Sequence, residues 1–158
     1  MRILFILLLS IPLSLFSQVK LIKVNVNLEK LEDGSRVDIA TVKLVKNEDE
    51  VLQKVIQKGR FKHKLDTGAI YKIYFSKVNH ATKFLLVDTR MLPNEAKKYQ
   101  KLRVTMVYFI EPEKNDLSFL NDTPVGVARY DDQHKKLRWD YEYAFLINEK
   151  IGKLLYEF

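Results

Sequence analysis

The chain has 158 residues, 47% hydrophobic and 30% charged, so it is long enough to bury a core and its composition is typical of a globular protein rather than a disordered one. It has no cysteine, which excludes disulfides, thiolate metal sites, a cysteine nucleophile and lipid attachment at an N-terminal cysteine. The net charge of +7 favours acidic partners, although basic residues spread along a chain are also typical of a solvated surface.

The first 17 residues differ from the rest of the chain. Arg2 is followed by an apolar run over residues 3–16 and by the small residue Ser17 before Gln18. This order is typical of a secretory signal peptide cleaved after Ser17. The alternative is a retained anchor, but the run is shorter than the roughly 20 residues of a membrane span and contains Pro12. We therefore expect a bacterial protein that is secreted, periplasmic or held in the cell envelope, without a stable membrane span after cleavage.

Residues 18–110 have the pattern of a β-sandwich domain. Alternation of apolar and polar residues predicts strands at residues 21–28, 37–45, 51–56, 82–88 and 102–110. In the second strand Val37 and Ile39 would face one way, and the later residues keep the alternation only if one residue near Ala40 is extra. We expect a β-bulge there.

Residues 57–76 predict a β-hairpin, which adds two strands. Residues 60–65 and 70–76 each alternate between apolar and polar side chains. Gly59 and Gly68 fall in the turns before and between them, where a positive φ favours glycine. Seven short antiparallel strands at close spacing are typical of a sandwich.

Residues 111–158 are predicted to be a C-terminal appendage packed on the sandwich. A linker at residues 111–116 precedes a strand at residues 125–130. From Tyr141 onward apolar residues recur at helical spacing, and Asp140 is placed to cap the helix.

One pattern in the predicted hairpin resembles the carboxypeptidase regulatory-like, or prealbumin-like, β-sandwich family. It reads Gly59-x-Phe61, then Leu65 and Gly68, then Tyr71-x-Ile73. The resemblance covers residues 19–92, and residues 124–143 look like the tail of small, uncharacterised exported bacterial proteins. It implies a mainly β fold: a seven-stranded prealbumin-like or immunoglobulin-like antiparallel β-sandwich with a C-terminal strand and helix. Modules of this family are mostly accessory, and few have an activity of their own.

The outward face of the predicted hairpin is the candidate binding site. Five residues would share it: Arg60, Lys62, Lys64, Lys72 and Tyr74. Basic side chains around an aromatic ring suit a polyanion or a sugar acid. The alternative is an ordinary solvent face, on which lysines are common and discourage aggregation at sheet edges.

The sequence indicates no catalytic, cofactor or metal site. His63, His80 and His134 are far apart, and Asp131, Asp132 and His134 give a weak signal for a cation. The chain has neither a Gly-x-Ser-x-Gly elbow nor a glycine-rich phosphate loop.

Three functions are compatible with these patterns. We expect a non-enzymatic exported envelope module that acts through protein or glycan contacts, with no nucleic-acid partner. The alternative is a binding protein for an anionic ligand, a polyanion or sugar acid, at the candidate face. The third is an enzyme, which would need a cleft lined by perturbed acidic groups or by His134.

Overall fold

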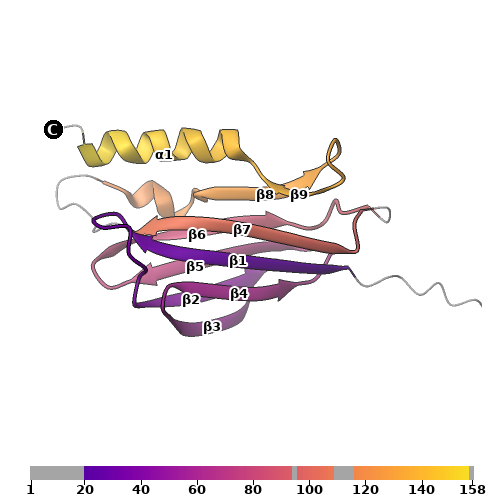
Figure 1. Ribbon diagram of the computed structural model, residues 1–158, viewed down its shortest axis with the longest axis horizontal. Helices are drawn as coiled ribbons and strands as arrows, with labels where there is room; N and C mark the ends of the chain where they lie inside the picture. The colour runs from indigo at the N-terminus through magenta and orange to yellow at the C-terminus, as the bar shows by residue number, and fades with distance from the viewer. Residues whose placement is uncertain (1–19, 94–95, 109–115, 157–158) are drawn as a thin grey trace, which may run out of the picture.

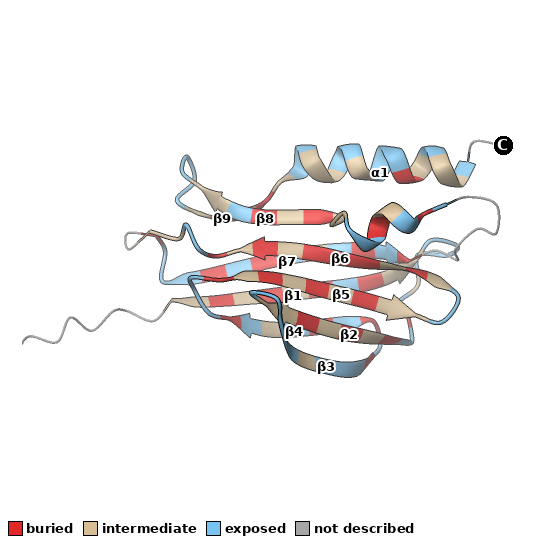
Figure 2. Cartoon of the chain, turned by 180° about the vertical axis from the view of Figure 1, so that it is seen from behind, coloured by how far each residue is buried: buried red, intermediate tan, exposed pale blue. Residues whose placement is uncertain are grey.

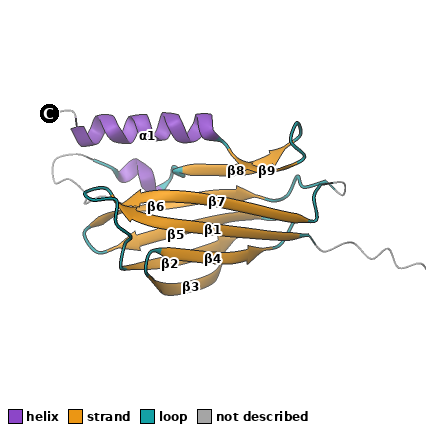
Figure 3. Ribbon diagram, in the orientation of Figure 1, coloured by secondary structure: helices purple, strands orange, loops and turns teal. Residues whose placement is uncertain are grey.

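The computed structural model describes residues 20–93, 96–108 and 116–156. In these ranges the chain forms nine strands, one 3-10 helix and one α-helix (Figures 1 and 3). In chain order they are β1 (Leu21–Lys30), β2 (Ile39–Lys46), β3 (Asp49–Gln57), β4 (Arg60–Leu65), β5 (Ile70–Lys77), β6 (His80–Asp88), β7 (Tyr99–Tyr108), η1 (Ser118–Asn121), β8 (Gly126–Asp131), β9 (Lys136–Trp139) and α1 (Tyr141–Tyr156). Neither helix of the described ranges has the length and apolar character needed to cross a membrane.

The strands form two sheets with the core between them. The smaller sheet has the order β4-β1-β7, and the larger has the order β3-β2-β5-β6-β8-β9. In Figure 1 the smaller sheet lies in front. The expected mainly β, sandwich-like fold is confirmed, but the prediction of seven antiparallel strands is wrong, because nine strands are described and the pairs β1–β7 and β6–β8 are parallel. Parallel neighbours are joined by long connections, which leave no local turn signal.

The predicted hairpin at residues 57–76 is also wrong, because β4 and β5 belong to different sheets. β4 pairs with β1, whereas β5 pairs with β2 and β6. Residues 66–69 therefore cross from one sheet to the other. The Thr89 hydroxyl holds this crossing: its oxygen lies 3.0 Å from the carbonyl oxygen of Asp66 and 2.8 Å from that of Ala69, and it accepts the Ala69 N–H at 3.0 Å.

The glycines of the two turns have the predicted positive φ, +56° at Gly59 and +81° at Gly68. At Gly59 space is limiting as well, since a Cβ there would lie 2.5 Å from the carbonyl oxygen of Leu28. No other residue type fits without moving β1. The turn thereby brings the start of β4 against the end of β1.

The irregularity in the second predicted strand lies elsewhere than expected. Val37 is buried but precedes β2, and Ile39 is 58% exposed, so these two residues do not face the same way. Ala40, Val42 and Leu44 then point into the core in regular alternation. The register shift between β2 and β3 falls at Leu44/Val45, so the bulge predicted near Ala40 is wrong.

The core consists of the inward residues of both sheets, seen in Figure 2 as buried positions that alternate with more exposed ones along the strands. Phe61 of β4 meets Phe75 of β5 edge to face, with ring centroids 5.8 Å apart. This contact joins the two sheets across the core.

The C-terminal residues extend the larger sheet. β8 lies beside β6, which confirms the predicted strand, and β9 pairs with β8. The predicted helix is confirmed as α1, and Asp140 caps it by accepting the Tyr143 N–H at 3.0 Å. A second small cluster, formed by Ala81, Leu117, Leu120 and Ile151, joins α1 and η1 to the start of β6. In Figure 1 α1 runs alongside β8 at the margin of the sandwich.

Candidate anion-binding face

The five predicted site residues do not share one face. Arg60, Lys62 and Lys64 are exposed on β4, in the three-stranded sheet. Lys72 and Tyr74 are partly buried on β5, in the six-stranded sheet. The separation follows from the crossing at residues 66–69, which replaces the expected hairpin.

Lys72 and Tyr74 are already engaged within the protein. Lys72 Nζ lies 3.0 Å from Glu48 Oε1, and this hydrogen bond raises the pKa of Lys72. The Tyr74 ring stacks on Phe84 with centroids 4.9 Å apart, and Lys43 Nζ lies 5.0 Å from its centroid. These two residues therefore stabilise the larger sheet rather than extend the β4 cluster.

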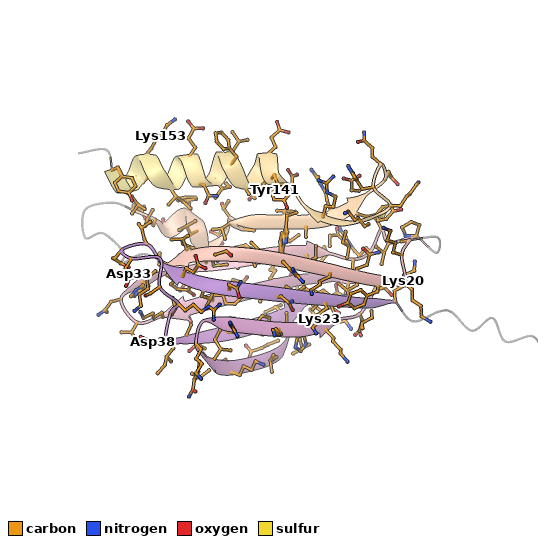
Figure 4. All side chains as sticks on the ribbon, viewed as in Figure 1. Lys20, Lys23, Asp33, Asp38, Tyr141 and Lys153 are labelled. Atoms are coloured by element: carbon orange, nitrogen blue, oxygen red, sulfur yellow. The ribbon has the colours of Figure 1, made fainter. Side chains whose placement is uncertain are left out.

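The three β4 residues form part of a larger surface, which we call the basic face. It comprises the outward residues in three consecutive rows of β4, β1 and β7: Arg60, Lys62, Lys64, Lys23, Asn25, Asn27, Lys101, Arg103 and Thr105. The register aligns them in three rows across the sheet, namely Lys64–Lys23–Lys101, Lys62–Asn25–Arg103 and Arg60–Asn27–Thr105. Figure 4 labels Lys23 on the central strand of this sheet.

The basic face is uncompensated. Six of its nine residues are cations and none is acidic. Within the part of the chain that the structure describes, no carboxylate forms an ion pair with any of the six. Adjacent strands lie only about 4.8 Å apart, and like charges directly opposite each other destabilise a sheet. The row Lys64–Lys23–Lys101 therefore carries a repulsion that an anion would relieve.

Two further groups suit an anionic ligand. Tyr99 lies at the end of β7 that precedes Lys101, and its side chain is 50% exposed, so an aromatic ring borders the cations. In the central row, Asn25 Oδ1 is buried and has no hydrogen-bond partner among the described residues. This oxygen is an acceptor, so it suits a hydroxyl of the ligand rather than its carboxylate.

The predicted site did not include Lys23, Lys101 and Arg103. Each was visible as a polar residue in an alternating strand, but the parallel pairing of β1 with β7 joins segments more than 70 residues apart along the chain. No local pattern encodes that pairing.

The histidines lie at separate places. His63 points inward and stacks on Phe61 with centroids 5.9 Å apart, and burial, then the nearby Lys54, lowers its pKa. His80 Nδ1 lies 2.8 Å from the Val78 carbonyl oxygen. Among the described residues no group of three His, Cys, Asp or Glu side chains has the arrangement of a metal site.

Asp131, one of the residues considered for a cation, is occupied by other groups. Its backbone and side-chain hydrogen bonds with His134, together with Arg138, lower its pKa to about 2. The distances from Asp131 Oδ2 are 2.8 Å to His134 Nδ1 and 3.0 Å to Arg138 Nη1. This carboxylate is therefore neutralised within its own turn.

Comparisons with known proteins leave the family open. No protein-family model and no curated protein matches the chain. Among solved structures the chain resembles a crystal structure of S.CueP at 10% identity and a TM-score of 0.37, over 56% of this chain and 62% of that one. The matched part thus spans less than two thirds of that protein, and the similarity is too low to carry an argument.

Proposed function

We propose that this protein is a non-enzymatic exported module of the bacterial cell envelope that binds an acidic glycan through the basic face. The observation that carries the proposal is the uncompensated array of six cations on one side of the three-stranded sheet. It unites the expected envelope module with its alternative, an anionic-ligand binding protein.

The arrangement suits a polymer better than a single small anion. Cations occupy every row and every strand of the basic face, so an extended chain of carboxylates or phosphates contacts several of them at once. Arg60 and Arg103 supply planar forks that bind such groups bidentately, and Tyr99 offers a surface on which a sugar ring can stack. Membership of the carboxypeptidase regulatory-like family is part of the proposal and would make the module accessory to other envelope components.

The binding test uses the full chain and polygalacturonate, a polymer of sugar acids, with uncharged dextran as the control polymer. In the face variant Lys23, Lys62 and Lys101 are replaced by Gln, and in the control variant Lys43, Lys54 and Lys77 of the larger sheet are replaced. Both variants lose the same charge. We expect the face variant to lose most of its affinity, measured by calorimetry, and the control variant to keep it. An equal loss in both would attribute binding to net charge and refute the site.

Export is tested separately. The intact mass of the protein recovered from the envelope fraction should correspond to a chain beginning at Gln18. Recovery of the full-length chain from the cytoplasm would contradict the exported location while leaving the face measurement valid. Capture of one envelope protein that resists high salt would instead favour protein contacts over a glycan.

A further inference from the structure

A cavity of about 530 Å³ lies between α1 and the two sheets, and it meets the basic face at Arg103 and Thr105 of β7. Its walls come from α1, from β7 at the edge of the smaller sheet, and from β6, β8 and β9 of the larger one. Figure 3 shows the helix running along these strands. The volume lies within the range of about 300–1,000 Å³ that is typical of sites for small organic ligands.

The wall of the cavity is mainly apolar. Its apolar residues include Leu85, Met106, Val125, Trp139, Ile151 and Leu155. Tyr141 and Tyr156 of α1 also line it although they are 69% and 65% exposed. A hydrocarbon chain in this space would bury apolar surface that the protein alone leaves open to water.

The cavity exists because α1 packs loosely against the two sheets. Ile151 is the one buried residue of α1. Gly152 lines the cavity, and a Cβ built on it would meet no atom within 4 Å. The shortage of side-chain volume on this side of α1 keeps the cavity open.

The charged groups of the wall favour an anion. Lys83 of β6 is 4% exposed, and its Nζ donates to the Val107 carbonyl oxygen at 2.6 Å. Arg103 of β7 lines the same cavity. The single acidic residue of the described lining, Asp140, is paired with Arg129 and caps α1.

Two further observations agree with an acceptor headgroup. Trp139 Nε1–H is buried and has no acceptor among the described residues. Burial lowers the pKa of Lys83 to about 7, so a nearby carboxylate would favour its charged form.

We propose that this cavity binds one single-chain amphiphile with a carboxylate head, placing the hydrocarbon chain between α1 and the sheets and the carboxylate beside Lys83 and Arg103. Arg103 belongs to both sites, but the two tests are separate, because the glycan test replaces Lys23, Lys62 and Lys101 and the cavity test replaces Gly152 and Lys83.

Trp139 is the sole tryptophan of the chain and lies in the cavity wall, so its fluorescence reports binding directly. The full chain is titrated below the micelle concentration with three probes of one chain length: dodecanoate, dodecanol and dodecyltrimethylammonium. We expect saturable one-to-one binding of dodecanoate, about tenfold weaker binding of dodecanol, and weaker binding still of the cation, because a charge-assisted hydrogen bond adds about that factor.

Three variants locate the site. Gly152→Leu fills the cavity, whereas the matched control Gly152→Ala gives a similar gain in helix propensity and fills little of it. We expect Gly152→Leu to abolish dodecanoate binding and Gly152→Ala to keep it. Lys83→Met should reduce the preference for dodecanoate over dodecanol to about threefold or less, while dodecanol binding persists.

Several outcomes overturn the proposal. Equal affinity for all three heads would show an apolar cavity without anion selectivity. Unchanged binding in Gly152→Leu would place the probe elsewhere. Absence of any change in Trp139 fluorescence would exclude the amphiphile as the occupant. A concentration-dependent dimer in analytical ultracentrifugation that buries Tyr141 and Tyr156 would exclude it as well. None of these results bears on polygalacturonate binding, so the two proposals fail separately.

Discussion

The outer faces of the two sheets are both rich in lysine, but they differ in how many of these charges are paired with a carboxylate. On the larger sheet and its turns, Lys72 pairs with Glu48 at 3.0 Å and Lys46 with Asp66 at 2.8 Å. The larger sheet thus neutralises Lys46 and Lys72 internally, although Lys43, Lys54 and Lys77 have no carboxylate partner among the described residues. On the smaller sheet all six cations of the basic face lack such a partner.

This difference shows that the number of lysines on a strand does not identify a binding face. Glu48 and Asp66 lie at the strand ends beside Lys72 and Lys46, so the turns supply the compensation. The smaller sheet has its nearest acidic outward residue, Glu29, beyond the three basic rows and opposite Val107. The strand register shows which lysines have a carboxylate neighbour. This pairing, rather than the number of lysines, distinguishes an ordinary solvent-exposed sheet from a surface suited to an anion.

The largest effect is expected at Lys83, the one lysine that is buried among the described residues. Its pKa is about 7 in the folded chain against 10.5 when unfolded. Below pH 7 both states are protonated; between pH 7 and 10.5 only the unfolded state holds the proton, so stability rises with pH by up to about 1.4 kcal/mol per unit. Lys83→Met should remove that rise.

The measurement is urea unfolding of wild type and variant at pH 6, 8 and 10. The stability advantage of Lys83→Met, expected to be a few kcal/mol at pH 6, should shrink as the pH rises. Lys98→Met, at an exposed lysine just before β7, should give a difference that does not depend on pH. A constant difference for Lys83→Met would contradict a low pKa at this site.

The second-largest effect is expected in the salt dependence of polygalacturonate binding, which should differ between variants of the two outer faces. With six cations engaged, affinity for polygalacturonate should fall by about 100-fold between roughly 50 and 200 mM salt, less than for duplex DNA because the polymer has a lower charge density. Substituting Gln for Lys23, Lys62 and Lys101 should make the logarithmic slope shallower. The same change at Lys43, Lys54 and Lys77 should leave the slope unaltered. Equal slopes in the two variants would refute the claim that the basic face, and not the larger sheet, binds the polymer.

The sequence predicted the positions of the strands far better than it predicted which strands pair with each other. Alternation placed β1, β4, β5 and β7 because each strand buries one side, whichever sheet it joins. It cannot distinguish a hairpin from a crossing between sheets, which here depends on Thr89, about 20 residues away from the turn. Of the six cations of the basic face, three therefore belonged to the predicted site and three did not.

Sequence patterns did not predict the cavity, for a related reason. Helical spacing predicted α1 and its cap at Asp140 but not how closely the helix packs. No sequence pattern marked Lys83 as buried, yet it occupies an inward position of β6 at 4% exposure. Its burial depends on β7 lying opposite, which is again a contact between distant segments.

The smallest expected effect is also the most direct comparison of the two faces, because one type of substitution should act with opposite sign on each. Lys23 lies between Lys64 and Lys101, so Lys23→Glu replaces two repulsive cross-strand pairs with attractive ones and should raise the free energy of unfolding by about 0.5–1 kcal/mol. Lys72→Glu breaks the pair with Glu48 and sets two carboxylates together, so it should lower stability by about 0.5 kcal/mol.

Urea unfolding at low salt measures both changes, and high salt should reduce each. Lys23→Gln, which removes repulsion without adding attraction, should fall between wild type and Lys23→Glu. Because Lys23→Glu should at the same time weaken polygalacturonate binding, a variant that is more stable but binds less would show that the chain sacrifices stability to keep the basic face. Destabilisation by Lys23→Glu would instead mean that the six cations do not repel one another, and the argument for an anionic ligand would lose its physical basis.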